Sequence, residues 1–252
     1  MLQDNLQPNN DTLLPYDVVT LPSQGIFTNG KKTEKETYLN ASDENLLSSQ
    51  ALLSTGKLVD SLIDRKVLDK DITAIQLPAC DKEAILIFLR NTAFGSEYEV
   101  ELVDKKTKEP FRTKLDLSVL RTKDIGVKLD TNMEFEFMLE KSNKKAKLSF
   151  ISPQDEQKLT EIDAQYKNDP QTPYMTKQLE MMVKEIDGVR DRMTIAQFIQ
   201  TMPIRDAQEI RKVIRDNTPS LDLNIPTTTP SGEEMNVKIS LGVEFFRPFY
   251  GI

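Results

Sequence analysis

The sequence predicts an α+β fold. It comprises an N-terminal α+β domain with a buried central helix and β-hairpins, then a helical segment and a C-terminal β-hairpin. The longest apolar run, Ala84 to Leu89, lies between two helix-end signals, which is typical of a buried helix. Other segments alternate apolar and polar residues on either side of charged or glycine-containing turns, as half-buried hairpin strands do.

Charge and hydropathy argue against two classes of partner. The chain of 252 residues has 33 Lys plus Arg and 40 Asp plus Glu, so its formal charge is −7. This charge repels phosphate backbones and anionic membrane surfaces. No apolar run approaches the ~20 residues that span a bilayer, and the N-terminus lacks the pattern of a signal peptide. We therefore expect no nucleic acid and no membrane as partners, and a cytosol-like compartment.

Residue types that carry catalysis are scarce. The chain has no histidine and a single cysteine, Cys80. This removes imidazole bases, histidine-activated nucleophiles and structural zinc sites. The nine glycines form neither GxGxxG nor GxxxxGK[ST], the usual loops for nucleotide phosphates. We expect no catalytic residue, no cofactor and no metal, and we expect Cys80 to be a small apolar residue beside the central helix.

Residues 1–35 are expected to form an extended N-terminal arm. The arm is polar and aperiodic up to about Asp11, and prolines at positions 15 and 22 argue against a helix between Leu13 and Phe27. Glu36 to Leu39 is predicted to form a short strand.

Three helices are predicted next. Asn40 has the side chain of a helix cap and precedes a first helix. A second, from about Gly56 to Val67, carries an apolar stripe at helical spacing. The third is the central helix, in which Asp81 is expected to accept a hydrogen bond from the first turn and Gly95 to close the last turn.

Two hairpins follow the central helix and complete an α+β core domain over residues 36–151. The first pairs 97–103 with 111–117, and the second pairs 133–139 with 145–151, because both regions alternate apolar and polar residues around polar turns.

Residues 152–217 are predicted to be helical. Ser152 caps the first helix and Pro153 occupies its first position, where a missing N–H costs least. Further helices are expected at 174–186, after Thr194, and at 203–215. The second carries a methionine-rich stripe, which we interpret as core-facing, with an adaptable docking groove as the alternative.

Residues 218–252 are predicted to form a third hairpin and an aromatic tail. Pro248 blocks a further regular strand ladder, so the aromatic cluster is expected to be a docking element. The alternative is that the tail folds back on its own domain. The candidate interaction residues, from the tail and the N-terminal arm, are Phe245, Phe246, Pro248, Phe249, Tyr250, Leu21 and Phe27.

Five pieces, in this order, carry a resemblance to a known family. They are LPSQGIF at 21–27, YLNASDENLLSS at 38–49, LPACDKEAILIFLRNTAFGSEYEVEL at 77–102, FIQTMPIRDAQEIRKVIRD at 198–216 and FFRP at 245–248. Together they resemble the baseplate hub and hub assembly family of T-even-type contractile-tailed bacteriophages, and they span most of the chain.

The resemblance implies a non-catalytic virion protein of the tail baseplate. It implies docking to other hub proteins and to the tape-measure protein, homo-oligomeric contacts, and residence in the host cytoplasm during assembly. Relatives carry CPxCG-like knuckles in the hairpins that correspond to Val103–Phe111 and Thr229–Glu233. Here these tips read VDKKTKEPF and TTPSGEE, so we expect zinc-free remnants of a ribbon-like tip.

Two functions remain open on this resemblance, a permanent hub subunit and a hub assembly chaperone that is absent from the mature virion. A carboxylate-based cell-wall hydrolase is a minor alternative. That activity would need an acid with a raised pKa in a cleft, next to a second carboxylate.

Overall fold

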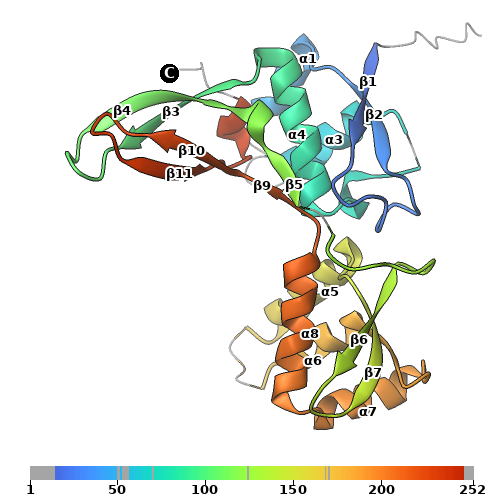
Figure 1. Cartoon of the computed structure of the whole chain (residues 1–252). Coiled ribbons are helices and arrows are strands. Elements are labelled where there is room, and N and C mark those ends of the chain that lie inside the picture. Colours follow the sequence, from blue (N-terminus) through green and yellow to red (C-terminus); the bar gives the residue numbers. More distant parts are fainter. Residues whose placement is uncertain are drawn as a thin grey trace, which may run out of the picture.

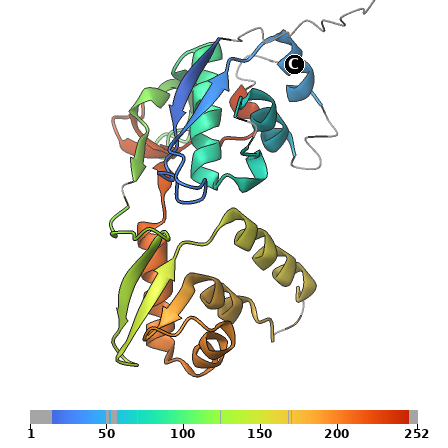
Figure 2. The same cartoon turned by 90° about the vertical axis from the view of Figure 1, so that its right-hand side faces the viewer.

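Figure 1 shows the computed structural model of the chain. It describes residues 15–246 except 50, 51, 53–56, 70, 124, 168 and 170. The described residues form two lobes (Figures 1 and 2). One, which we call the composite lobe, is built from residues 15–123 and 218–246. The other, the inserted lobe, is built from residues 125–217. Both mix helices with small sheets, which confirms the predicted α+β class.

The composite lobe contains both ends of the described chain. Its elements are β1 (Tyr16–Thr20), β2 (Thr33–Thr37), α1 (Ala41–Leu47), α3 (Leu58–Lys66), η1 (Ala74–Gln76), α4 (Ala79–Phe94), β3 (Glu97–Val103), β4 (Pro110–Asp116), η2 (Leu117–Val119), β5 (Arg121–Lys123), β9 (Ser220–Asp222), β10 (Asn224–Thr228), β11 (Glu234–Lys238) and η3 (Val243–Phe246).

Helix α4 is the centre of this lobe, as predicted. It buries residues on several faces, and Ile85, Leu86 and Leu89 are each at most 2% exposed. Gly95 ends the helix with φ at 81°, a conformation that glycine adopts without a steric penalty. The other two predicted helices are present as α1 and α3, and Asn40 caps α1 in a capping box.

The predicted role of Asp81 was wrong. Asp81 lies inside the first turn of α4, and it accepts hydrogen bonds from the main-chain N–H of Ser23 at 2.8 Å and from its hydroxyl at 2.6 Å. The carboxylate is fully buried, so it binds the loop that crosses the helix end. Gly25 permits the tight course of this loop, since a Cβ there would lie 2.6 Å from the carbonyl carbon of Gly30.

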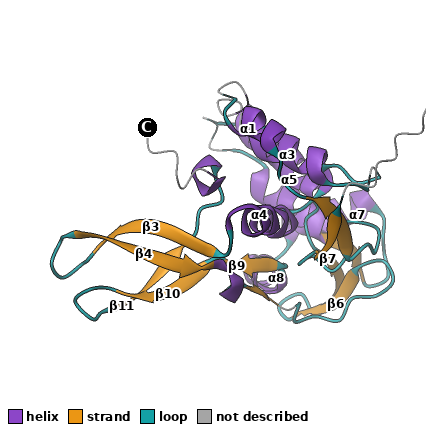
Figure 3. Cartoon of the chain, turned by 90° about the horizontal axis from the view of Figure 1, so that it is seen from above, coloured by secondary structure: helices purple, strands orange, loops and turns teal. Residues whose placement is uncertain are grey.

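Two long hairpins, β3–β4 and β10–β11, form a projection from the composite lobe (Figures 1 and 3). We call this pair of hairpins the arm; it is distinct from the predicted N-terminal arm. Strand β3 pairs with β4 from Glu97↔Asp116 to Val103↔Pro110, and β10 pairs with β11. Both hairpins were predicted. Strand β10 also packs near β4, and half-buried Tyr98, Val100 and Val237 from the two hairpins join the same core.

The inserted lobe contains a three-stranded antiparallel sheet in the order β6-β7-β8, covered by helices. Its elements are β6 (Glu134–Leu139), β7 (Lys144–Ser149), α5 (Pro153–Gln165), α6 (Tyr174–Met182), β8 (Val183–Ile186), α7 (Arg192–Thr201) and α8 (Ile204–Asn217). Ser152 caps α5 through the N–H of Asp155, with Pro153 in its first turn, as predicted.

The helix predicted at 174–186 is half wrong, because it ends at Met182 and the chain continues as strand β8. Val183 and Ile186 have the β-branched side chains that favour strands, and β7 offers them an open edge, where Ala146 pairs with Ile186. Of the five stripe residues, Leu179, Met182, Val183 and Ile186 are buried in the core of the inserted lobe, whereas Met175 is 50% exposed. The core interpretation therefore holds for all of the stripe except its first residue.

The two chain segments that join the lobes pair with each other. Strand β5 leaves the composite lobe, β9 returns to it, and they form an antiparallel ladder from Arg121↔Asp222 to Lys123↔Ser220. The inserted lobe is therefore nested between two parts of one fold. The predicted domain boundaries at 35, 151 and 217 stay a prediction. The packing groups the elements differently: hairpin β6–β7 shares a core with helices α6 to α8, and the 218–246 segment shares a core with α4.

Candidate functional site

The structure places three of the predicted docking residues inside their own chain. Leu21 and Phe245 are 0% exposed and Phe246 is 3% exposed, and all three belong to the core of the composite lobe. They form no free docking surface. The alternative, that the tail folds back on its own domain, describes the tail as far as Phe246.

Arg90 in α4 contacts the tail where it packs on the core. Its guanidinium is fully buried in α4 and lies 5.2 Å from the ring centroid of Tyr98 and 5.7 Å from that of Phe245. It also donates to the main-chain oxygens of Gly95 and Glu97, at 2.5 and 3.0 Å. A buried cation stacked between aromatic faces is stabilised by their quadrupoles, so Phe245 completes the surroundings of a buried charge.

Phe27 has a different environment. It is half-buried and packs, with Ile26, against the core of the inserted lobe. The loop that Asp81 holds through Ser23 therefore reaches across to the other lobe. Pro248, Phe249 and Tyr250 lie outside the described residues, so their docking role stays a prediction.

The arm, formed by hairpins β3–β4 and β10–β11, is the next candidate for an interaction surface. Each hairpin is a separate two-stranded sheet, and among the described residues no other strand pairs with an outer edge of either. Unpaired strand edges are templates for strand addition from another chain. Val103, near the tip, is 56% exposed.

The outward face of the β3–β4 hairpin is a ladder of paired charges. Arg112 lies 3.1 Å from Glu101, and Lys114 lies 2.7 Å from Glu97. All four side chains are mostly exposed, so these pairs contribute little to stability. They make this face polar, whereas the opposite face carries the residues that pack on the other hairpin.

The two hairpin tips are joined by one carboxylate. Asp104 accepts hydrogen bonds from the main-chain N–H of Lys106 at 2.8 Å and of Thr107 at 3.3 Å. It also accepts from the N–H and the hydroxyl of Ser231, each at 3.1 Å. Burial favours a higher pKa, but these hydrogen bonds, with that of the Ser231 hydroxyl foremost, lower the pKa of Asp104 to about 2. The arm is thereby closed at its far end.

The best candidate for carboxylate catalysis is Glu34 in β2. Its side chain is 0% exposed, and the Nζ of Lys31 lies 3.3 Å from it and 3.0 Å from Asp69. Burial, followed by the hydrogen bond with Asp69, raises the pKa of Glu34 to about 7. A raised acid beside a second carboxylate is what a hydrolase needs. However, five clefts in the described part of the chain have linings that do not include Glu34.

Metal binding, membrane insertion and thiol chemistry are the other possibilities to consider in the described residues. No group of three or more His, Cys, Asp or Glu side chains is placed to hold a metal ion there, and no helix in the same ranges is long and apolar enough to cross a bilayer. Cys80 is buried in the first turn of α4, and burial raises the pKa of its thiol far above the ordinary value. It is therefore an unreactive thiol.

Comparison with known proteins decides the family. The family model described as T4 bacteriophage base plate protein matches residues 18–247. The chain belongs to the T4 bacteriophage base plate protein family. No curated protein and no solved structure gave a significant match.

Membership of the base plate protein family confirms the coarser part of the sequence interpretation. It indicates a structural part of the phage tail base plate, located in the virion tail and associated with other tail proteins. The matched range includes both lobes and the whole arm.

Sequence reasoning missed two residues that matter most for the arm and the tail of this base plate protein. Asp104 opens the turn DKKT, a position where aspartate typically caps the following N–H groups, so its local contacts were predictable. The contact with Ser231 spans 127 positions and has no local signal. Arg90 gave no signal either, because an arginine late in a helix is usually solvated.

Proposed function

We propose that the chain is a structural subunit of the base plate hub, docked to other central hub proteins and to the tape-measure protein. The observation that carries the proposal is the family match over residues 18–247. The choice of the hub within the base plate rests on the five sequence pieces, in their order, that resemble the hub family.

The arm is the surface on which we propose that docking takes place. It projects from the composite lobe (Figure 3), it ends in tips held together by Asp104, and it presents strand edges that no described strand covers. A rigid projection loses less conformational entropy on binding than a mobile loop would. Homo-oligomeric contacts in the assembly and a cytoplasmic stage before assembly belong to the same proposal.

Cross-linking within purified tails tests the proposal. The tip carries three exposed lysines, Lys105, Lys106 and Lys108, whereas the exposed Lys212 lies on α8 in the inserted lobe. An amine-reactive cross-linker should join the tip lysines to hub proteins or to the tape-measure protein. Cross-links from the tip only to proteins of the outer base plate would contradict a hub position. The alternative function, an assembly chaperone that leaves, predicts such cross-links in assembly intermediates and none in virions.

A further inference from the structure

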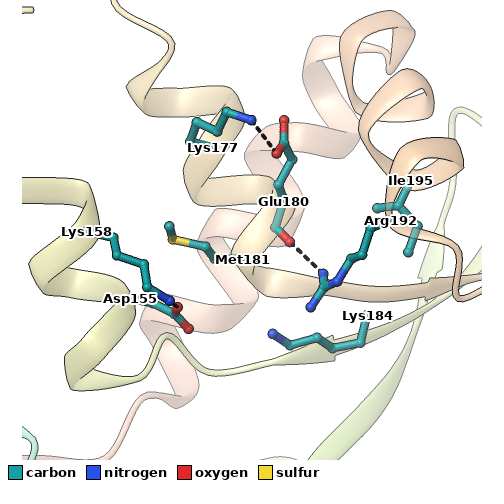
Figure 4. A pocket seen from close by; sticks show the side chains of 8 residues that line it. All are labelled: Asp155, Lys158, Lys177, Glu180, Met181, Lys184, Arg192 and Ile195. Carbon is teal, nitrogen blue, oxygen red and sulfur yellow. Dashed lines mark hydrogen bonds and ion pairs between the residues drawn. The ribbon is translucent and has the colours of Figure 1, made fainter. Parts of the chain in front are cut away.

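A small cleft in the inserted lobe is lined by more cationic than anionic side chains. The cleft has a volume of about 230 Å³ and lies between α5, α6, β8 and α7 (Figure 4). Its charged lining consists of four cationic side chains, Lys158, Lys177, Lys184 and Arg192, and two carboxylates, Asp155 and Glu180. The lining therefore carries two positive charges in excess, in a chain whose formal charge is −7.

Two of the four cations are already paired. The Nζ of Lys158 lies 3.2 Å from Asp155, and the Nζ of Lys177 lies 2.7 Å from Glu180. Both pairs join residues three apart on one helix, so each is satisfied within its own element. The excess charge is therefore that of the other two side chains.

Arg192 is held in place without being neutralised. One of its Nη atoms donates to the main-chain oxygens of Glu180 at 3.1 Å and Val183 at 3.3 Å. Carbonyl oxygens fix the guanidinium plane but bring no negative charge. The remaining N–H groups of the guanidinium are a rigid fork of the kind that binds carboxylates.

The side-chain ammonium of Lys184 makes no hydrogen bond and no ion pair with the residues that the structure describes. It is half-buried on β8, and its side chain extends across the floor of the cleft near Arg192 (Figure 4). Burial, and then the positive charge of Arg192, lower the pKa of Lys184, although the negative charges of Asp155 and Glu134 partly offset this effect. An ammonium with little water and a like charge nearby destabilises the fold unless something else neutralises it.

We propose that this cleft binds a carboxylate side chain from an acidic segment of a neighbouring protein, held between Lys184 and Arg192. Its volume suits a side chain and not a polymer backbone. A nucleic acid would present a row of phosphates, whereas the cleft offers two cations that no carboxylate of its lining pairs with, Lys184 and Arg192. The inference goes beyond the proposed function, because the cleft lies in the inserted lobe, apart from the arm, and does not depend on a position in the hub.

The experiment is an NMR titration of the full-length chain with an end-capped hexaglutamate peptide. Hexaglutamine serves as the uncharged control. Saturable shifts of amides in the 180–192 region are expected with hexaglutamate and not with hexaglutamine, and they should weaken as salt is added. Absence of saturable shifts there, or equal shifts with hexaglutamine, would overturn the proposal.

Lys184→Met and Lys184→Gln test the residue, with Lys212→Met as the matched control on α8. Loss of one charge-assisted hydrogen bond should weaken hexaglutamate binding roughly tenfold for both Lys184 variants and leave the control unchanged. Because Lys184 is unpaired, both variants should melt at or above the parent temperature. Binding as tight as in Lys212→Met would refute the assignment, and so would a cleft that takes tripolyphosphate but not the peptide.

Discussion

Asp104, at the tip of one hairpin, accepts hydrogen bonds from both the main-chain N–H and the hydroxyl of Ser231, at the tip of the other. The two residues are 127 positions apart, and between them lie the whole inserted lobe and both strands of the β5–β9 ladder. One carboxylate thus closes the arm at its far end, while the core around α4 holds it at the base.

Asp104→Asn should loosen the tips without unfolding the chain. An amide keeps the size of the carboxylate but has one acceptor oxygen. Three of the four hydrogen bonds reach Oδ1, and that of the Ser231 N–H reaches Oδ2, so the amide of Ser231 should exchange hydrogen faster. Glu109→Gln, an exposed change in the same turn, is the control and should leave exchange unaltered. Because the pKa of Asp104 is lowered to about 2, protection in the parent should persist down to about pH 3. Equal rates of amide hydrogen exchange in the two variants would show that Asp104 does not hold the hairpin tips together.

Phe245→Ala should destabilise the composite lobe. Its ring is 0% exposed and contacts the Tyr98 ring at 5.3 Å between centroids. We expect a loss of about 3–5 kcal/mol in the free energy of unfolding, measured by urea denaturation. Val103→Ala, at a 56% exposed position, should change it by about 0.5 kcal/mol or less.

A chain that ends at Val243 gives a second test of the tail. On the docking interpretation it would stay as stable as the parent, whereas burial of Phe245 and Phe246 predicts a large drop in melting temperature by circular dichroism. A truncated chain that melts with the parent would restore the docking interpretation for these two residues.

Leu86→Ala tests α4 as the stability centre. Leu86 is 2% exposed, so its truncation leaves a cavity and should cost about 2–5 kcal/mol. Ile75→Ala, on the neighbouring η1 at a 58% exposed position, is the control. Melting of Leu86→Ala within a degree or two of that control would show that the helix is not the centre of the core.

Glu34→Gln should change how stability depends on pH. The pKa of Glu34 is raised from an ordinary value of 4.5 to about 7 by burial and by Asp69, so the folded state holds a proton that the unfolded chain has released. The free energy of unfolding therefore falls as pH rises from about 4.5 to about 7 and is level above that.

The neutral amide removes this loss. At pH 8 Glu34→Gln should be more stable than the parent, by about 3 kcal/mol, and at pH 4.5 the two should be nearly equal. Thermal unfolding across this range measures the difference. A parent curve that runs parallel to that of the variant would mean that Glu34 titrates normally.

Local signals predicted most of the elements. Asn40 and Ser152 cap the helices that follow them, Gly95 ends α4, and the hairpins alternate as the strand period requires. Val183–Ile186 was predicted as helix, because apolar spacing of three and four fits a helix whether or not a strand edge such as that of β7 is available.

Long-range pairing was beyond the sequence. Strands β5 and β9 pair, from Arg121↔Asp222 onward, so the inserted lobe lies between two parts of the composite lobe in the sequence. Neither of these short strands has a sequence pattern that indicates which segment it pairs with. The same limit applies to the site. Phe245 looked like an anchor for another protein because aromatic side chains favour burial. The structure shows that this burial lies within the chain, where Phe245 is 0% exposed and packs near Arg90.

Mass spectrometry of purified virions tests the central claim, a permanent structural subunit of the tail base plate. The account predicts that the chain is present at a fixed ratio to the other base plate proteins, and that the ratio survives purification in high salt. Its absence from mature virions, together with its presence in infected cells, would contradict the claim and identify an assembly factor that leaves.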